Sequence, residues 1–251
     1  MSNAPTKGYA LFDLDQTLVP WDMQLLFANW LLNRQPARRI YLTFFLLALP
    51  LNRLLGAERM KRLFLAILHG LSPEELDQLG REFVDHYLPD LLYPEVVALL
   101  RQHQEKGDLT ILTSASPYFY VRHIGEALGV DHTFGTEVIL DGLFPTFPTG
   151  NNKSENKISR LRPWLESNGH PVKFPLPHST SYTDSSADLP LILASKDVVL
   201  VNPSKRLLST VTHDLKMSPK VLRPSRPFNS HFSHLKDAAL MLLGLYSVEK
   251  K

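Results

Sequence analysis

The chain has 251 residues, enough for one large hydrophobic core or for a core with a small second domain. Hydrophobic residues make up 44% and charged residues 21%, a composition that excludes a disordered or fibrous protein. The absence of cysteine excludes disulfides, thiolate metal sites and cysteine nucleophiles. The net charge of +2 is too small to indicate nucleic acid as a partner.

Two buried strands are predicted in the first half of the chain, at Tyr9–Phe12 and Leu109–Thr113. Between them the sequence predicts only helices, at Met23–Leu32, Arg38–Leu49, Glu58–Leu68, Pro73–Tyr87 and Pro94–Gln104. A crossover between parallel strands needs only about a dozen residues, so the excess indicates an inserted helical domain.

Strands and helices alternate after Pro117. We expect helices at Val121–Leu128, Glu155–Ser167 and Asp188–Ala194. We expect strands at Thr136–Leu140, which turns back towards Leu143–Phe147, at Ser179–Thr183 and at Val198–Val201. This order predicts an α/β fold with a doubly wound parallel sheet, in which ligands bind beyond the carboxyl ends of the strands.

The predicted domain organisation is discontinuous. Residues 1–19 and 96–217 form the α/β core, residues 20–95 form a helical cap, and residues 218–251 form a linker and a C-terminal helix. The expected linker is Ser218–Asn229, and the expected helix, His231–Tyr246, packs on the core or on another subunit. The alternative is that this helix forms a second contact with a membrane interface.

Two carboxylates follow the first strand, on Asp13 and Asp15. At this spacing they repel each other unless one is protonated or a cation lies between them. Mg²⁺ favours such a pair, completed by water and phosphate oxygens, and the neighbouring carboxylate can act as a nucleophile or proton donor. The alternative is that both residues only cap a helix or form a turn.

Further polar residues lie at or near later strand ends. Ser114 and the backbone N–H of Ala115 follow the second strand, Lys157 begins a helix, and Asp184 and Asp188 follow the strand Ser179–Thr183. Each alone is typical of a turn, a solvated lysine or a helix cap. Their occurrence at successive strand ends favours one shared site.

Four sequence motifs resemble those of the haloacid dehalogenase-like hydrolases, within their phosphoserine phosphatase-like subfamily. The motifs are FDLDQTL at Phe12–Leu18, ILTSASP at Ile111–Pro117, Lys157, and the acidic segment Tyr182–Leu191. The resemblance implies a Rossmann-like core with a helical cap inserted after the first strand. Lys153 competes for the lysine role, and we favour Lys157 because it lies at the start of the helix that follows.

The resemblance also implies a role for each residue. Asp13 is the expected nucleophile that forms an aspartyl-phosphate, and Asp15 is the expected general acid and base. The remaining expected assignments are phosphate binding by Thr17, Ser114 and Ala115, charge neutralisation by Lys157, and Mg²⁺ binding by Asp13, the Asp15 carbonyl, Asp184 and Asp188.

The predicted cap has an unusual apolar and basic pattern. Its longest uncharged run, Ile40–Asn52, has 13 residues, whereas a membrane-spanning helix needs about 20. Residues 23–57 contain no acidic residue, and arginines flank the apolar run. One interpretation is a small core within the cap. The other is peripheral contact with an anionic membrane through residues 34–62.

The segment Asp22–Pro36 resembles the cap of C-type phosphatidylglycerophosphatases, which implies a lipid phosphate as substrate. We therefore expect an Mg²⁺-dependent phosphomonoester hydrolase acting on such a lipid. The alternatives are a phosphatase of a soluble metabolite such as phosphoserine, and a non-catalytic membrane-binding protein of the same fold. The polar start, residues 1–8, predicts a cytoplasmic protein, peripheral at the inner face of the cell membrane in the lipid version.

Overall fold

The computed structural model describes residues 8–226 and 231–247, and its centre is a six-stranded, all-parallel sheet. The strands are β1 (Tyr9–Phe12), β2 (Leu109–Pro117), β3 (His132–Thr136), β4 (Ser179–Thr183), β5 (Asp197–Val201) and β6 (Lys220–Leu222). Their order in the sheet is β3-β2-β1-β4-β5-β6. The predicted doubly wound α/β fold is confirmed.

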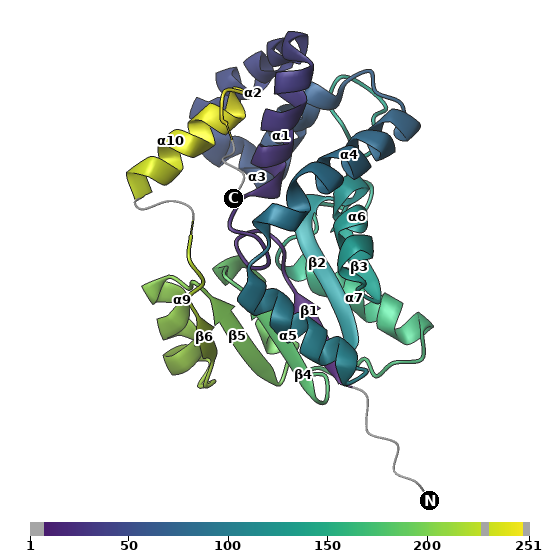
Figure 1. The fold of residues 1–251 in the computed structure, drawn as a ribbon, viewed down its shortest axis with the longest axis vertical. Coiled ribbons are helices and arrows are strands. Elements are labelled where there is room, and N and C mark those ends of the chain that lie inside the picture. The colour runs from purple at the N-terminus through teal and green to yellow at the C-terminus, as the bar shows by residue number, and fades with distance from the viewer. Residues whose placement is uncertain (1–7, 227–230, 248–251) are drawn as a thin grey trace, which may run out of the picture.

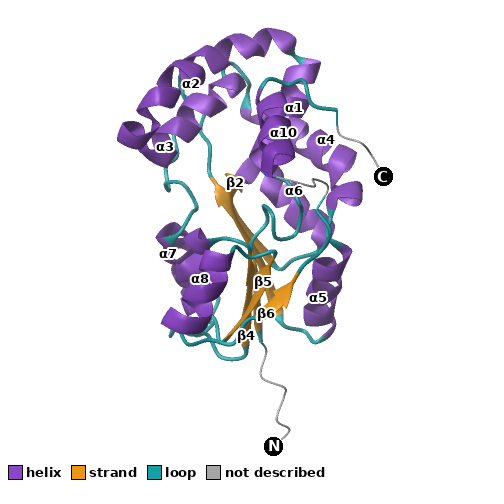
Figure 2. Ribbon diagram, turned by 90° about the vertical axis from the view of Figure 1, so that its left-hand side faces the viewer, coloured by secondary structure: helices purple, strands orange, loops and turns teal. Residues whose placement is uncertain are grey.

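Helices cover both faces of the sheet, as Figure 2 shows with α5 on one side and α7 and α8 on the other. The helices of the sheet domain are α5 (Pro94–Glu105), α6 (Tyr118–Leu128), α7 (Glu155–Ser167), α8 (Leu189–Leu193) and α9 (Lys205–Ser209). A π-helical turn (Thr210–Asp214) extends α9. A strand that is covered on both faces has no solvent side, so β1 reads as an unbroken apolar run and is buried along its whole length.

A second group of helices lies beyond the carboxyl ends of the strands (Figure 1). It contains α1 (Met23–Arg34), η1 (Pro36–Tyr41), α2 (Leu42–Ala48), η2 (Leu49–Leu51), α3 (Asn52–Phe64), η3 (Leu65–Leu68) and α4 (Pro73–Leu91). The side chain of Asp22 caps α1, and Ser72 and Glu75 form a capping box at the start of α4. The helix predicted at Arg38–Leu49 is divided between η1 and α2, and the helix predicted at Glu58–Leu68 is divided between α3 and η3. Pro50, and Gly56 with a φ of +76°, interrupt the helical path between the two predicted helices.

Aromatic packing joins these helices to the sheet domain. The ring of Phe27 on α1 lies 5.2 Å from Phe83 on α4, 5.1 Å from Phe119 and 5.4 Å from Tyr120 on α6, measured between ring centroids. A Cβ added to Gly80 of α4 would lie 2.5 Å from the carbonyl oxygen of Phe119, so α4 approaches α6 at a distance that only glycine allows. The cap and the sheet domain therefore share one continuous hydrophobic core.

The structure corrects several predicted elements. A strand is expected at Thr136–Leu140, but β3 covers His132–Thr136 and ends where the expected strand begins. In the turn that follows, an antiparallel bridge joins Ile139 and Thr146. Strand β6 lies inside the segment expected to be a linker, of which residues 227–230 are outside the described residues. Turn residues at 218 and 224 masked the short β6 pattern in the sequence.

The C-terminal helix α10 (His231–Leu242) packs against α1. Asn29 of α1 exchanges two hydrogen bonds with the backbone of Tyr246, donating to its carbonyl and accepting from its N–H, each at 3.0 Å. Arg39 donates to the carbonyls of Leu243 and Gly244 at 3.0 and 3.1 Å. The end of the described chain is thus held on the cap.

Replacing Phe27 by alanine should lower the free energy of unfolding by about 3–5 kcal/mol, because the lost ring leaves a cavity between α1, α4 and α6. Leu54→Ala is the matched control, since this side chain is 79% exposed, and its effect should stay within about 0.5 kcal/mol. Urea denaturation followed by circular dichroism measures both. Equal losses for the two variants would contradict the shared core.

Candidate active site

The candidate site lies where the strand order of the sheet reverses, between β1 and β4. Asp13 follows β1 and Asp184 follows β4, and both side chains line one cavity beyond the strand ends. Ligands of open α/β sheets bind at this kind of switch point. The topology therefore brings together two acidic segments that are far apart in the sequence, as the sequence predicts.

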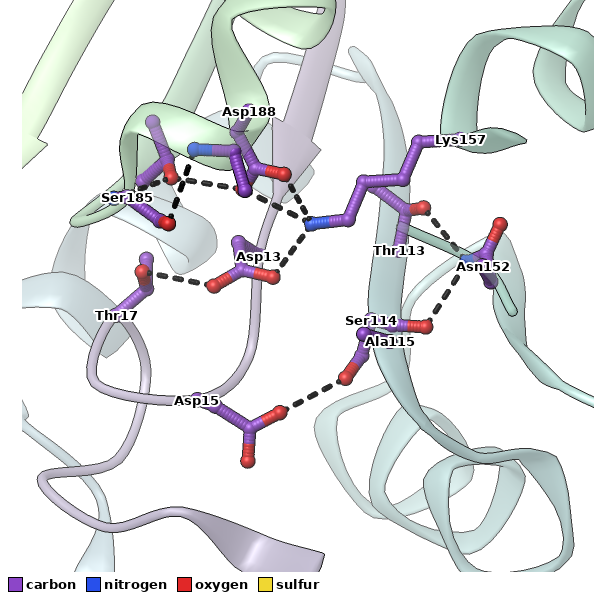
Figure 3. A network of polar contacts seen from close by, with 12 residues as sticks. Asp13, Asp15, Thr17, Thr113, Ser114, Ala115, Asn152, Lys157, Ser185 and Asp188 are labelled. Carbon is purple, nitrogen blue, oxygen red and sulfur yellow. Dashed lines mark hydrogen bonds and ion pairs between the residues drawn. The ribbon is translucent and has the colours of Figure 1, made fainter. Parts of the chain in front are cut away.

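Lys157 lies between two of the carboxylates (Figure 3). Its Nζ is 2.6 Å from Oδ1 of Asp13 and 2.8 Å from Oδ1 of Asp188, and the side chain is 2% exposed. Thr183 also donates a hydrogen bond to Asp188, at 2.8 Å. Burial alone would lower the pKa of Lys157, but the two carboxylates raise it above its usual value. The lysine is therefore a permanent cation beside Asp13, whereas Lys153 lines the cavity with an exposed side chain.

Asp15 is held by three hydrogen bonds. Its Oδ2 accepts from the hydroxyls of Ser114 and Ser116 at 3.0 and 2.9 Å, and its Oδ1 accepts from the backbone N–H of Met23 at 2.7 Å. Burial, assisted by the nearby carboxylate of Asp22, raises the pKa of Asp15 to about 6 despite these donors. A carboxyl group with a raised pKa and a fixed position is suited to donate a proton.

The cavity holds more negative than positive charge around Asp13. Burial, together with repulsion from neighbouring carboxylates, raises the pKa of Asp13 to about 7 and that of Asp184 to about 8. Asp15 and Asp188 add two further carboxylates, and Lys157 is the cation in direct contact with Asp13. A divalent cation would offset this excess.

The donor set suits magnesium rather than a metal held by a full protein cage. Within residues 8–226 and 231–247, no group of three or more His, Asp or Glu side chains is arranged to hold a metal by itself. Mg²⁺ usually takes one or two carboxylates and completes its shell with water and phosphate oxygens. Asp13 and Asp184 both face the cavity and fit that requirement, whereas the carboxylate of Asp188 is already bound by Lys157 and Thr183.

The three residues predicted to bind phosphate occupy different positions. Ala115 lines the cavity. The hydroxyls of Thr17 and Ser114 are buried and donate to carboxylates, Thr17 to Oδ2 of Asp13 at 3.2 Å and Ser114 to Asp15. In the structure these hydroxyls hold the two catalytic candidates in place, and their contact with phosphate stays a prediction.

Asn152 is a site residue that the sequence did not identify. This fully buried amide donates to the carbonyl of Ser114 at 2.9 Å and to Thr113 Oγ1 at 3.2 Å (Figure 3). In a trans peptide the C=O and the N–H point in opposite directions. By holding the Ser114 carbonyl, Asn152 fixes the direction of the Ala115 N–H.

Lys61 of α3 is the second residue that the sequence did not place at the site. Its Nζ donates to Ala115 O, to Thr136 Oγ1 at 3.0 Å and to Asn151 Oδ1 at 2.9 Å, and it lines the cavity. Burial lowers its pKa to about 8. The cap thus contacts the end of β2 directly.

The neighbours of Lys61 on α3 contact the same part of the core. Glu58 accepts from the Asn151 N–H at 3.3 Å, and Arg62 donates to the Pro145 carbonyl at 2.7 Å. Positions 58, 61 and 62 share one helix face, and this spacing is the signal that could have identified the contact from the sequence.

The comparisons with known proteins agree with this geometry. A family model for haloacid dehalogenase-like hydrolases matches residues 10–192. A histidinol-phosphatase of Neisseria meningitidis is 28% identical over 80% of this chain and 93% of its own length. The phosphoserine phosphatase SerB1 of Mycobacterium tuberculosis is 30% identical over 80% of this chain and 66% of its own length.

Solved structures share the fold. A protein of unknown function from Bordetella pertussis is 28% identical, with a TM-score of 0.70 over 86% of this chain and 99% of its own. A substrate-bound phosphoserine phosphatase is 15% identical, with a TM-score of 0.57 over 93% of this chain and 99% of its own. The chain belongs to the haloacid dehalogenase-like hydrolase family, and it is an enzyme of the phosphatase type, a phosphoric monoester hydrolase.

Proposed function

We propose that the protein is an Mg²⁺-dependent phosphomonoester hydrolase that works through an aspartyl-phosphate on Asp13. The observation that carries this proposal is the buried Lys157, 2.6 Å from the Asp13 carboxylate, with the general-acid candidate Asp15 two residues further along the chain. Phosphoryl transfer depends mainly on positioning and on charge neutralisation.

The reaction takes two displacements. A carboxylate oxygen of Asp13 attacks phosphorus, the bond from phosphorus to the alcohol oxygen breaks, and Asp15 gives that oxygen its proton. Water then attacks phosphorus, Asp15 accepts the proton of this water, and the bond to Asp13 breaks to release phosphate. Lys157 offsets negative charge beside Asp13 in both steps.

We assign Mg²⁺ binding to Asp13, the backbone carbonyl of Asp15 and Asp184, and we propose that the fourth predicted ligand, Asp188, instead holds Lys157 beside them. When bound, the metal supplies positive charge to the phosphate oxygens and orients the phosphate. Thr17 keeps the Asp13 carboxylate in place, and Asn152 and Ala115 present a backbone N–H for a phosphate oxygen.

For the substrate we propose a phosphomonoester on an anionic lipid headgroup, such as phosphatidylglycerophosphate. One observation favours it: the cap helix α3 lines the cavity through Ala57 and Lys61 and also carries the exposed side chain of Leu54, and Leu51 at the end of η2 is exposed as well. A place at the inner face of the cell membrane goes with this substrate. The alternative is a soluble metabolite, to which the names of the relatives point: histidinol phosphate or phosphoserine.

The third hypothesis, a non-catalytic membrane-binding protein, has less support. Charged side chains are costly to bury unless they are paired or bind a ligand. Here Asp13, Asp15, Lys157, Asp184 and Asp188 are all present and gathered at one switch point.

Substitutions of Asp13 and of two of the cavity lysines, Lys157 and Lys153, test the mechanism. Asp13→Asn and Lys157→Met should each reduce kcat for an aryl phosphate, measured with Mg²⁺, by at least about 1,000-fold, because they remove the nucleophile or its buried cation. The matched control Lys153→Met should stay within about tenfold of the unsubstituted protein, since its side chain is exposed. Turnover that survives in Asp13→Asn would refute the aspartyl-phosphate.

Metal binding should depend on pH in a defined direction. The folded pKa values of Asp13, Asp15 and Asp184, about 7, 6 and 8, exceed the ordinary value of 3.8. The folded state then binds more protons than the unfolded state, so these groups cost the metal-free protein stability as pH rises from about 4 to 8. Mg²⁺ should relieve this cost at pH 8 and have little effect at pH 5.

Differential scanning fluorimetry measures this effect. All measurements use one Mg²⁺ concentration, 100 times the Kd of the unsubstituted protein at pH 8. At this concentration Mg²⁺ should raise the melting temperature by about 5–10 °C at pH 8, and by less in Asp184→Asn. Equal shifts at pH 5 and pH 8, or an undiminished shift in Asp184→Asn, would contradict the proposed site.

A phosphate-release screen separates the two substrate classes. With phosphatidylglycerophosphate dispersed in detergent, so that membrane binding has no influence, kcat/KM should exceed the values for phosphoserine and histidinol phosphate by at least about tenfold. The reverse order would assign the enzyme to soluble metabolites and leave the Asp13 chemistry intact.

A further inference from the structure

An unusual concentration of exposed apolar side chains covers the outside of the cap. Of the fourteen large hydrophobic side chains that are exposed in the described residues, seven fall within residues 40–54. We call these seven the cap surface: Ile40, Phe44, Leu46, Leu47, Leu49, Leu51 and Leu54, which are 39–79% exposed. A concentration of exposed apolar side chains in one short segment is typical of an interaction site.

The sequence also allows a second interpretation of the apolar run, a small core within the cap. The structure supports it only for the inward side chains, since Phe45 packs 5.3 Å from Phe64 and Leu42 is 2% exposed. Leu47 and Leu54 are 73% and 79% exposed, so most of each side chain faces solvent. The small core within the cap therefore leaves these outward side chains open to a partner.

The charges around the cap surface have one sign. Residues 34–62 contain seven Lys and Arg and a single acidic residue, Glu58. Arg53 and Arg59 are exposed and form no ion pair with any described residue. A second copy of the chain would bring two such basic rims together and be repelled, whereas an anionic lipid surface would be attracted.

The end of α10 adjoins this surface. Arg39 of η1 donates hydrogen bonds to the carbonyls of Leu243 and Gly244. The side chains of Leu243 and Leu245 are 40% and 59% exposed. Figures 1 and 2 both show α10 beside α1, beyond the carboxyl ends of the strands. The C-terminal helix thus adds apolar side chains next to the cap surface.

The segment that carries the surface is suited to lie on a membrane rather than cross it. By length and composition, Pro36–Leu68 could span a bilayer, and only 6% of its most apolar 18-residue window is buried. It is, however, broken at Pro50 and at Gly56, and Lys61 and Arg62 near its end are bound to the core. A short amphipathic helix with basic flanks binds in the interfacial region of a bilayer.

We propose that the cap surface, extended by the end of α10, docks on an anionic lipid bilayer and that this docking brings the cavity to membrane-borne phosphate. The docking is argued from exposure and charge alone, whereas the approach of the cavity to membrane-borne phosphate rests on the proposed function. Residue Leu54 of the surface and residue Ala57 of the cavity lining are only three positions apart on α3. A phosphate held at the level of lipid headgroups is therefore close to the cavity when α2 and α3 lie on the membrane.

Vesicle flotation with the full chain tests the docking. The protein should bind vesicles of phosphatidylcholine with 30% phosphatidylglycerol and bind pure phosphatidylcholine at least tenfold more weakly. Leu47→Asp with Leu54→Asp should abolish binding, whereas the control pair Ile139→Asp with Leu193→Asp, at side chains 49% and 54% exposed outside the cap, should keep it. Arg53→Gln with Arg59→Gln should weaken binding by about 25-fold, or about fivefold per arginine, and Arg81→Gln with Arg206→Gln should not.

Aryl phosphatase activity, measured in parallel on every variant, shows that each one is folded and keeps the two proposals separate. In the unsubstituted protein, normal activity without vesicle binding would overturn the docking and leave the hydrolase intact. Vesicle binding without activity would do the opposite. Binding that is indifferent to Leu47→Asp with Leu54→Asp, or a dimer in light scattering that this pair dissociates while vesicles are not bound, would also overturn the docking.

Discussion

The structure depends on one electrostatic constraint, the burial of several carboxylates around a single lysine at the end of β1. Asp13 and Asp188 share Lys157, while Asp184 and Asp15 stand nearby with raised pKa values. Such a group of charges is costly to keep away from water unless a cation or a ligand completes it. The parallel sheet brings these carboxylates together because the carboxyl ends of its strands meet at one place. The proposed reaction depends on the same arrangement.

The cap completes the site from the other side. Lys61 contacts the end of β2 through Ala115, and Asn152 holds the neighbouring Ser114 carbonyl from the core loop. Two adjacent peptide groups at the predicted phosphate site are therefore each fixed by a different segment of the chain. The aromatic contacts of Phe27 keep the cap seated on α6, which ties the position of Lys61 to the packing of the whole cap.

The sequence predicts the parts of this molecule that depend on local patterns. Strand β1, helix α7 and strand β4 lie where the patterns place them, because an apolar run or a helical period is a property of neighbouring residues. The four motifs also predict which residues meet at the switch point. Strand β6 and the helical turn over residues 52–55 were missed, because three residues at a sheet edge and a single helical turn leave almost no pattern. Lys61 and Asn152 were missed for another reason: their roles arise from contacts between distant segments.

The central claim is that Asp13 accepts the phosphoryl group beside a metal held by the Asp184 segment. The most direct test is a crystal structure of the protein with Mg²⁺ and beryllium fluoride, which mimics a phosphoryl group on a carboxylate. The account predicts beryllium bound to a carboxylate oxygen of Asp13, with Mg²⁺ between Asp13 and Asp184 and Lys157 still in contact with Asp13. Beryllium fluoride on another residue, or a metal that avoids Asp184, would contradict it.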